Sequence, residues 1–277
     1  MQRRIIKDKL FEIIIIIFAL VSTFPLILIL FQIVKKGIAS INWSFFVNLP
    51  QPPGESGGGV SNAILGTFIL IVIAGGFSIL LGVLGGTFIS EYKDKKISEL
   101  IRLCVNIFQG IPSIVIGIIV YIWIVMPLHR FSALSGGIAL GIMMLPLIVK
   151  STEETLRLIP SSLKEASLAL GASYTTTMLR VILPAGINGI LSGILISVSR
   201  VAGETAPLLF TAFGNPFMNF NIFKPVDSLP LLIFNYSMSP YPEWHSIAWG
   251  ASFVLISFII ILNILTKMVS RKWKTVF

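Results

Sequence analysis

Charged residues are scarce in this chain of 277 residues. Asp, Glu, Lys and Arg together make up 12% of the sequence, whereas hydrophobic residues make up 55%. A soluble domain usually carries about 25% charged residues. Too few polar side chains are present to cover a water-facing surface, so the composition excludes an ordinary soluble domain. The length suffices for about half a dozen membrane spans of ~20 residues each.

Residues that bind metals or act as nucleophiles are also rare. The single cysteine, Cys104, excludes an internal disulfide. The two histidines, His129 and His245, are isolated and lack ligand-type spacing. The chain has no phosphate-cradling G-x-x-x-x-G-K-S/T segment. We therefore expect no metal, no bound cofactor and no catalytic centre, and any ATP that drives this protein must be hydrolysed by another subunit.

Six apolar stretches are long enough to cross a bilayer as helices. The fourth is the shortest, and we expect its helix to continue past Lys150 as an amphipathic segment. The first is about twice as long as a signal-peptide core, so we expect it to be retained. The sequence predicts one all-α, polytopic membrane domain over residues 1–277, with spans at Leu10–Val34, Asn62–Ser90, Val105–Met126, Ala133–Val149, Ala185–Phe213 and Ser246–Met268.

The net charge of +9 comes from basic clusters between the apolar runs, a pattern typical of topology signals and not of nucleic-acid binding. Sixteen basic residues lie on one predicted side and four on the other, with Arg200 inside a span. Cytoplasmic loops collect Lys and Arg, so we expect both termini in the cytoplasm. The sixteen are Arg3, Arg4, Lys7, Lys9, Lys93, Lys95, Lys96, Arg102, Lys150, Arg157, Lys164, Arg180, Lys267, Arg271, Lys272 and Lys274, and the four are Lys35, Lys36, Arg130 and Lys224.

Two outer segments are predicted to be irregular. Residues 35–61 contain Pro50, Pro52, Pro53 and a glycine run. Residues 214–245 are rich in Pro, Asn and aromatic residues and almost uncharged. Two interpretations of this second segment stay open, a cap over a pathway and a surface loop with aromatic anchors.

The cytoplasmic segment of residues 150–180 carries helix signals. Residues 151–154 resemble a helix cap followed by acidic residues in the first turn, and Pro160 ends that helix. One of the two serines after Pro160 can cap a second helix over residues 163–170, and Gly171 can terminate it. A short helix with one small apolar face suits docking into the groove of a partner. That face consists of Leu163, Ala166, Ala169 and Leu170.

The spacing in this segment resembles the EAA motif of ABC importer permeases, with Ser167 in place of the more usual second alanine. In that family the motif forms a coupling helix that seats in a cleft of the cytosolic ATPase. The resemblance implies that residues 163–171 couple this chain to an ATPase; an ordinary interfacial helix is the alternative. The matching residues are Glu165, Ala166, Gly171, Leu183 and Pro184.

Two charges lie inside the fifth predicted span. Insertion scales assign about 2.5–3.5 kcal/mol to an arginine at the centre of a membrane helix, so Arg200 should face the bundle interior or a water-filled path. Its i,i+4 spacing allows a pair with Glu204 that only fixes helix packing. Alternatively, the guanidinium forks two hydrogen bonds to an oxyanion, and Glu204 limits the affinity. Arg200, Glu204 and Thr205 are the candidate residues of a substrate pathway.

The sequence Gly-Glu-Thr-Ala-Pro-Leu-Leu at Gly203–Leu209 resembles the signature of PstA-type permeases of phosphate ABC importers. The segment Gly110–Gly117 is similar to the G-x-P-S-x-V-x-G sequence of the same family. We interpret its Gly110, Pro112 and Ser113 as a helix kink in preference to substrate contacts. Together with the EAA-like loop, the resemblance covers essentially the whole chain and implies a MetI-like fold.

The resemblance further implies a cell-membrane permease that transports phosphate. It would pair with a PstC-type permease, two PstB-type ATPases and an extracytoplasmic PstS-type phosphate-binding protein. The alternatives are the same fold with another oxyanion as cargo, namely sulfate, molybdate or phosphonate, and less favourably a secondary transporter. A secondary transporter predicts inverted repeats and no docking helix; the sequence has the helix signals and no evident repeat.

Overall fold

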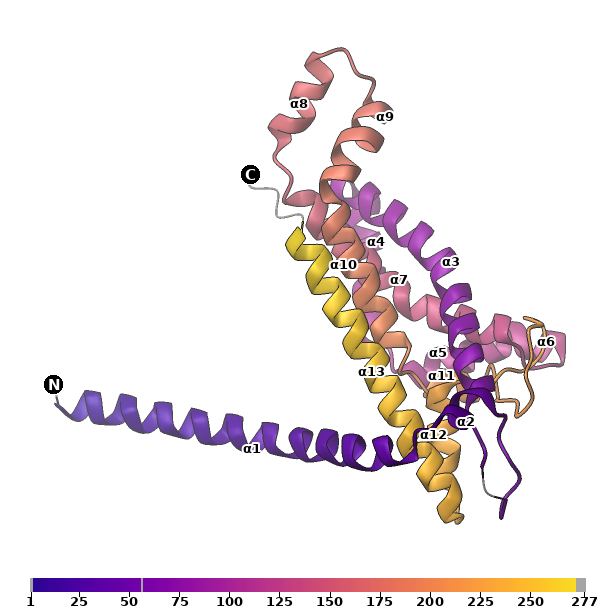
Figure 1. Cartoon of the computed structure of the whole chain (residues 1–277). Coiled ribbons are helices and arrows are strands. Elements are labelled where there is room, and N and C mark those ends of the chain that lie inside the picture. Colours follow the sequence, from indigo (N-terminus) through magenta and orange to yellow (C-terminus); the bar gives the residue numbers. More distant parts are fainter. Residues whose placement is uncertain (1, 56, 273–277) are drawn as a thin grey trace.

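The computed structural model describes residues 2–55 and 57–272, so Lys274 lies outside the described residues. Over these residues the chain is almost entirely helical, and its only β-type pairing is an isolated bridge between Phe213 and Val226. The all-α prediction is confirmed. Figure 1 shows a bundle of long helices, with α8 (Ser161–Ala169) and α9 (Tyr174–Thr177) projecting at one end and α1 (Gln2–Ser40) extending away from it.

Five helical segments in the described part of the chain are long and apolar enough to cross a membrane. The third predicted span, Val105–Met126, is wrong as a continuous helix. Its place is taken by two helical arms that meet at 104° around Ile111 and Pro112, so the predicted count of about six requires this bent pair to be one crossing. The five are α1, α3 (Ser61–Glu91), α7 (Ala133–Arg157), the segment Tyr174–Val201 and α13 (Pro242–Lys272), and the bent pair comprises α4 (Lys96–Gly110) and Ser113–Leu128.

Proline accounts for the sharp bend. Pro112 has no backbone N–H and disfavours helical geometry at the preceding residue. Ile111 accordingly takes an extended conformation (φ −73°, ψ 129°). The chain resumes as α5 (Ser113–Val120), followed by the π-helical turn η1 (Tyr121–Val125) and α6 (Met126–Leu128).

The fourth predicted span continues past Lys150 as expected, but the predicted helix start at residues 151–154 is wrong. α7 is a single helix that begins at its cap Ser132, whose side chain accepts a hydrogen bond from the Ser135 N–H, and ends at Arg157. Thr152 and Glu153 are buried in its last two turns. The buried face of α7 therefore continues through residues 151–154, where the sequence predicts a helix cap.

The fifth predicted span, Ala185–Phe213, has wrong boundaries at both ends. The membrane helix begins at Tyr174 and passes through α9, the π-helical turn η2 (Met178–Ile182) and α10 (Leu183–Val201). In η2 the Leu183 N–H bonds to the Met178 carbonyl, five residues back. In a regular α-helix a proline ring clashes with the carbonyl four residues before it. Directly before Pro184 the π turn replaces the four-residue hydrogen-bond spacing by a five-residue spacing. After Val201 the chain breaks and forms the short helix α11 (Ala206–Leu209).

Both outer segments contain helix. In the first, α1 continues to Ser40 and α2 (Trp43–Val47) follows. In the second, α12 (Leu229–Ser237) precedes α13. The stretch between α11 and α12 covers the outer end of α7, because the Lys224 and Ile222 carbonyls accept hydrogen bonds from the Ala133 and Leu134 N–H groups at 3.0 and 2.9 Å.

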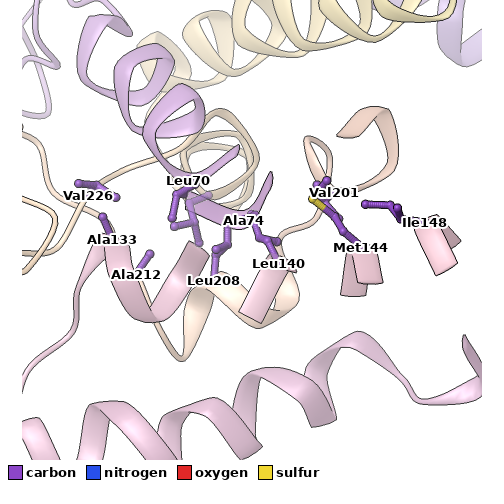
Figure 2. Packing of buried hydrophobic residues seen from close by; sticks show 11 residues of the cluster. Leu70, Ala74, Ala133, Leu140, Met144, Ile148, Val201, Leu208, Ala212 and Val226 are labelled. Carbon is purple, nitrogen blue, oxygen red and sulfur yellow. The ribbon is translucent and has the colours of Figure 1, made fainter. Parts of the chain in front are cut away.

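The apolar core lies between α3 and α7, with contributions from α10 and α11 (Figure 2). Each of the two central helices has a Gly-x-x-x-Gly pair at the contact, Gly82 and Gly86 on α3 and Gly137 and Gly141 on α7. A Cβ on Gly86 would lie 2.6 Å from the Val149 carbonyl oxygen. Small residues at such positions let two membrane helices approach closely, which is how they gain packing energy in lipid.

We predict that Gly86→Ala destabilises the protein, because the added methyl group collides with backbone that can move only if α3 and α7 separate. Overpacking of this kind typically costs about 1–3 kcal/mol. The matched control is Gly76→Ala on the same helix, where a Cβ would meet nothing within 4 Å. Thermal unfolding in detergent should show a lower Tm for the first variant only; equal Tm values would contradict the prediction.

Candidate functional site

The predicted docking helix exists and ends where predicted. α8 begins at Ser161 directly after Pro160 and has no side-chain cap, so the predicted serine cap is wrong. At its end Gly171 has φ +82°, a left-handed conformation that glycine adopts without strain. The Gly171 N–H bonds to the Leu168 carbonyl at 2.9 Å, and the Ala172 N–H to the Ser167 carbonyl at 3.3 Å. These two bonds form a Schellman motif, which stops the helix and turns the chain back.

One side of α8 is attached to the bundle. Lys164 pairs with Glu91 at the end of α3, and its ammonium lies 4.9 Å from the centre of the Tyr174 ring. The Ser167 and Thr177 hydroxyls are hydrogen-bonded at 2.9 Å. Leu163 packs inward against a buried cluster, so it does not belong to the exposed face on which the sequence placed it.

The opposite side of α8 faces outward. Glu165, Ala166 and Ala169 are exposed, and Leu170 is 89% exposed. This side of α8 presents an exposed leucine next to small residues, and the other side fixes the helix to the bundle. Such an apolar surface on a fixed helix can be covered by a partner. The arrangement can serve as a docking element, as the sequence predicts.

Leu183 and Pro184 lie apart from this outward side. Leu183 packs against the same inner cluster as Leu163, and Pro184 occupies the first turn of α10, as predicted. Leu183 therefore helps to hold the returning membrane helix against α8.

The candidate pathway residues occupy the end of α10 and the break that follows. Arg200 is exposed in the last turn of the helix, which ends at Val201, so Glu204 no longer lies on the same helical face. Within the described part of the chain the Arg200 guanidinium has neither a hydrogen bond nor an ion-pair partner, and the self-neutralised pair does not form. Thr205 is half-buried and lines a cavity of about 350 Å³ together with α1, α12 and α13.

The third-span motif meets the segment that follows Arg200. Gly110 ends α4, Pro112 precedes α5 and Ser113 is its first residue, so the motif forms a break in the helix, sharper than the predicted kink. A Cβ on Gly117, the last residue of the motif, would lie 2.6 Å from the Pro207 Cα. The sequence contained no signal that pairs these two segments, because 90 residues separate them.

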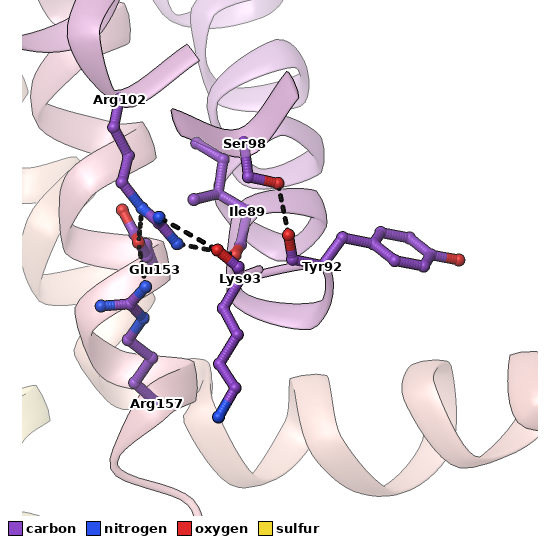
Figure 3. A network of polar contacts seen from close by, with 7 residues as sticks. All are labelled: Ile89, Tyr92, Lys93, Ser98, Arg102, Glu153 and Arg157. Atoms are coloured by element: carbon purple, nitrogen blue, oxygen red, sulfur yellow. Dashed lines mark hydrogen bonds and ion pairs between the residues drawn. The ribbon is translucent and has the colours of Figure 1, made fainter. Parts of the chain in front are cut away.

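Sequence reasoning also missed an ionic cluster around the buried Glu153 at the α8 end of the bundle. The Glu153 carboxylate on α7 accepts the Arg102 Nε–H at 2.7 Å and lies 2.9 Å from an Arg157 guanidinium nitrogen. Arg102 on α4 also donates to the carbonyls of Ile89 and Lys93, at the end of α3, at 3.3 and 3.2 Å (Figure 3). Glu153 is only 8% exposed, and Arg102 links this buried charge on α7 to α4 and to the end of α3.

A second missed feature lies at the opposite end of the bundle. A pocket of about 740 Å³ has Asp227, Asn215, Tyr236 and Trp244 in its wall. The Asp227 carboxylate accepts the Ser228 N–H at 2.8 Å and the Asn62 amide at 3.4 Å. Burial raises the pKa of Asp227 to about 7, and the two hydrogen bonds only partly oppose this effect. The available signal was that Asp227 is one of only two acidic residues, with Glu243, in the almost uncharged segment of residues 214–245.

Comparison with known proteins defines the class. The model of the family described as "Binding-protein-dependent transport system inner membrane component" matches residues 78–275. Among solved structures, a chain of the inward-facing MetNI methionine ABC transporter has a TM-score of 0.63 at 18% identity, covering 77% of this chain and 95% of that chain. A chain of an amino acid ABC transporter has a TM-score of 0.53 at 18% identity, with coverages of 76% and 92%. The fold is that of the permeases of ABC transporters.

Relatives of similar length identify the family within this class. The chain is 39% identical over 256 residues to the phosphate transport system permease protein PstA of Yersinia pestis, covering 92% of this chain and 87% of the relative. It is 37% identical to a probable PstA of Methanocaldococcus jannaschii, with coverages of 91% and 90%. The Pasteurella multocida PstA is 32% identical, with coverages of 96% and 95%. This chain belongs to the PstA family of inner membrane transport permeases.

We predict that Asp227→Asn makes stability less dependent on pH. The folded protein holds the Asp227 proton up to a pKa of about 7, whereas the ordinary value is 3.8. This contribution is therefore complete below pH ~4 and is lost as the pH rises to about 7. Asn keeps the shape and never ionises, so the Tm of the variant relative to the wild type should increase by a few degrees between pH 5 and 8.

The control for this measurement is Asp94→Asn, in the exposed turn between α3 and α4. Its Tm should follow that of the wild type at both pH values. A Tm difference for Asp227→Asn that stays constant from pH 5 to 8 would contradict the prediction.

Proposed function

We propose that this chain is the permease subunit of an ATP-driven phosphate importer. It forms half of the translocation pathway and couples to a cytosolic ATPase through the helix of residues 163–171. The observation that carries the cargo assignment is the segment Gly203–Leu209 directly after the unpaired Arg200, in a chain whose relatives are named phosphate transport permeases.

The chemistry of Arg200 supports an oxyanion as cargo. A guanidinium donates two parallel hydrogen bonds to a tetrahedral oxyanion, which a lysine cannot match. An arginine exposed to lipid would be costly, so the exposed side of Arg200 should be covered by another subunit or by a water-filled path. Glu204 is half-buried in the following turn, and its negative charge would keep anion binding weak enough for release.

The coupling assignment rests on α8. Its attached side transmits displacement to α3 and α9, and its outward side, which includes Glu165, Ala166 and Leu170, is available to an ATPase. Because the chain lacks a phosphate-cradling loop of its own, two PstB-type ATPases would supply hydrolysis. The α8 side is then cytoplasmic, which agrees with the excess of basic residues there and puts both termini in the cytoplasm.

The remaining partners are those that the family resemblance implies. A PstC-type permease would complete the path on the exposed side of Arg200, and an extracytoplasmic PstS-type protein would deliver phosphate at the outer end. Sulfate, molybdate or phosphonate is the alternative cargo for the same arrangement. A secondary transporter is less favoured, because it has no use for a held helix with a free docking side.

Reconstitution of the four components in proteoliposomes tests the function. Uptake of radiolabelled phosphate should require both ATP and the binding protein, and a tenfold excess of sulfate or molybdate should not inhibit it. Uptake that proceeds without ATP would favour a secondary transporter. Uptake of sulfate or molybdate in place of phosphate would assign the alternative cargo.

In this assay we predict that Arg200→Ala lowers phosphate flux at low external phosphate at least tenfold, since the forked hydrogen bonds are lost. Arg200→Lys should be intermediate, because it keeps the charge without the fork. The control is Arg130→Ala, which removes an exposed arginine in the α6–α7 connection that lies 5.7 Å from the Phe223 ring. Undiminished uptake in Arg200→Ala would leave this arginine with a packing role only.

We further predict that Gly171→Arg abolishes transport while the protein still inserts in the membrane. A Cβ at Gly171 meets nothing within 4 Å, so the defect would come from the positive φ and not from a clash. Gly171→Asn is the matched control, because asparagine tolerates the left-handed conformation. Phosphate uptake and ATP hydrolysis should be uncoupled in the first variant and close to wild type in the second; normal uptake in Gly171→Arg would refute the coupling role.

A further inference from the structure

The cluster formed by the buried Glu153 with the partly exposed Arg102 and Arg157, called here the Glu153 clamp, joins parts of the chain that have different proposed roles. Both arginines approach the same carboxylate oxygen, Oε1 of Glu153. A buried carboxylate that loses its cationic partners is strongly destabilised. The contact between α4 and α7 is therefore hard to break while the rest of the bundle stays folded.

Arg102 makes the clamp a three-helix junction. Its side chain binds Glu153 on α7 and two carbonyls at the end of α3, while its own backbone belongs to α4. The start of α4 is held again by the Ser98 hydroxyl, which donates to the Tyr92 carbonyl at 2.6 Å. An apolar cluster of Ile89, Val105 and Val149 lies beside these bonds. Polar and apolar contacts thus attach α4 firmly at its α8 end.

On one side, the clamp lies next to the docking helix. Glu153 and Arg157 occupy the last turns of α7, and only residues 158–160 separate α7 from α8. Ile159 in this connection packs against the cluster of Leu156 and Ile182. A displacement of α8 therefore acts directly on the turn that carries the clamp.

On the other side, α4 leads to the candidate pathway. α4 continues across the break at Ile111 and Pro112 into α5. Gly117 of α5 is in close contact with Pro207, which lies seven residues after Arg200. The clamp is the polar contact that ties α4, the first arm of this route, to the helix that bears α8.

We propose that Glu153 is a positioning residue, which makes α4 follow the end of α7 when the docking helix moves and thereby links ATPase motion to the pathway near Arg200. The proposal rests on the proposed function, since it names the part that transmits the motion. Two helices joined by a buried charge move as one body. Without that charge α4 is held by weaker contacts, and α5 then follows α7 only through apolar contacts such as those of Ile116 and Val120 with Ala139.

The test uses Glu153→Gln in the complete reconstituted importer, because glutamine keeps the shape and removes the charge. Uptake of radiolabelled phosphate and ATP hydrolysis are measured in the same vesicles. We expect hydrolysis within about twofold of the wild type and phosphate imported per ATP lowered about tenfold. Glu154→Gln is the matched control, since Glu154 is the exposed neighbour on the same helix and has no ion pair among the described residues; its ratio should be unchanged.

A double variant separates positioning from mere stability. If Arg102 and Glu153 act as one unit, Arg102→Gln combined with Glu153→Gln lowers the phosphate-to-ATP ratio no further than either change alone. If Glu153→Gln does not assemble, Arg102→Gln carries the test with the same expected ratio, because Glu153 then keeps Arg157 as its partner.

An unchanged ratio in an assembled clamp variant would overturn the proposal. So would a parallel loss of hydrolysis and uptake, because that result indicates damaged assembly and not lost transmission. The wild-type vesicles distinguish a failure of the proposed function from a failure of the clamp proposal. Absence of ATP-driven phosphate uptake there would overturn the proposed function and the clamp with it, whereas normal wild-type uptake with an unchanged variant ratio overturns the clamp alone.

Discussion

The close approach of α3 and α7 is the contact on which the other elements depend. Glycines on both helices bring the two backbones together, and in lipid this packing replaces the hydrophobic effect as the source of association. Each helix then supplies attachments at both ends. α3 holds α8 through Glu91 and the outer segment through Thr67, which accepts the Leu229 N–H at 2.9 Å. α7 carries Glu153 at one end and receives the outer segment at the other.

Most helices could be predicted from the sequence because apolar runs of sufficient length have few alternatives in a bilayer. The errors came where an apolar run changes direction. Residues on both sides of Pro112 are apolar, so hydropathy gives no sign of the 104° bend. The end of α10 was missed because apolar residues resume at Ala206–Leu209 after the short polar stretch of Glu204 and Thr205, so the predicted span was continued past the break.

In the candidate site, features that depend on local sequence could be predicted, and features that depend on long-range contacts could not. The Gly171 turn could be predicted because it depends on the conformation of one residue and its immediate neighbours. Glu153 was assigned to a helix cap because a serine and a threonine precede it, whereas its actual partner Arg102 is 51 residues away. Long-range contacts of this kind leave no local pattern. The roles of Arg200, Glu204 and Thr205 stay predictions, although the structure excludes the ion pair within α10.

The first helix is attached to the rest of the chain near one end only. Gly37 is buried against α13 and Lys36 lies over the Trp249 ring, whereas the side chains of Phe11, Phe18 and Phe31 are exposed. Between Gly37 and Phe11 the helix is about 39 Å long at 1.5 Å per residue, so a rotation of about 10° at the attached end moves the far end by about 7 Å. A small change at the attached end of α1 therefore produces a large displacement at its other end. The contacts near Gly37 and Lys36 therefore fix the position of α1 within this chain, and the apolar surface of the rest of the helix is left for lipid or for other proteins in the membrane.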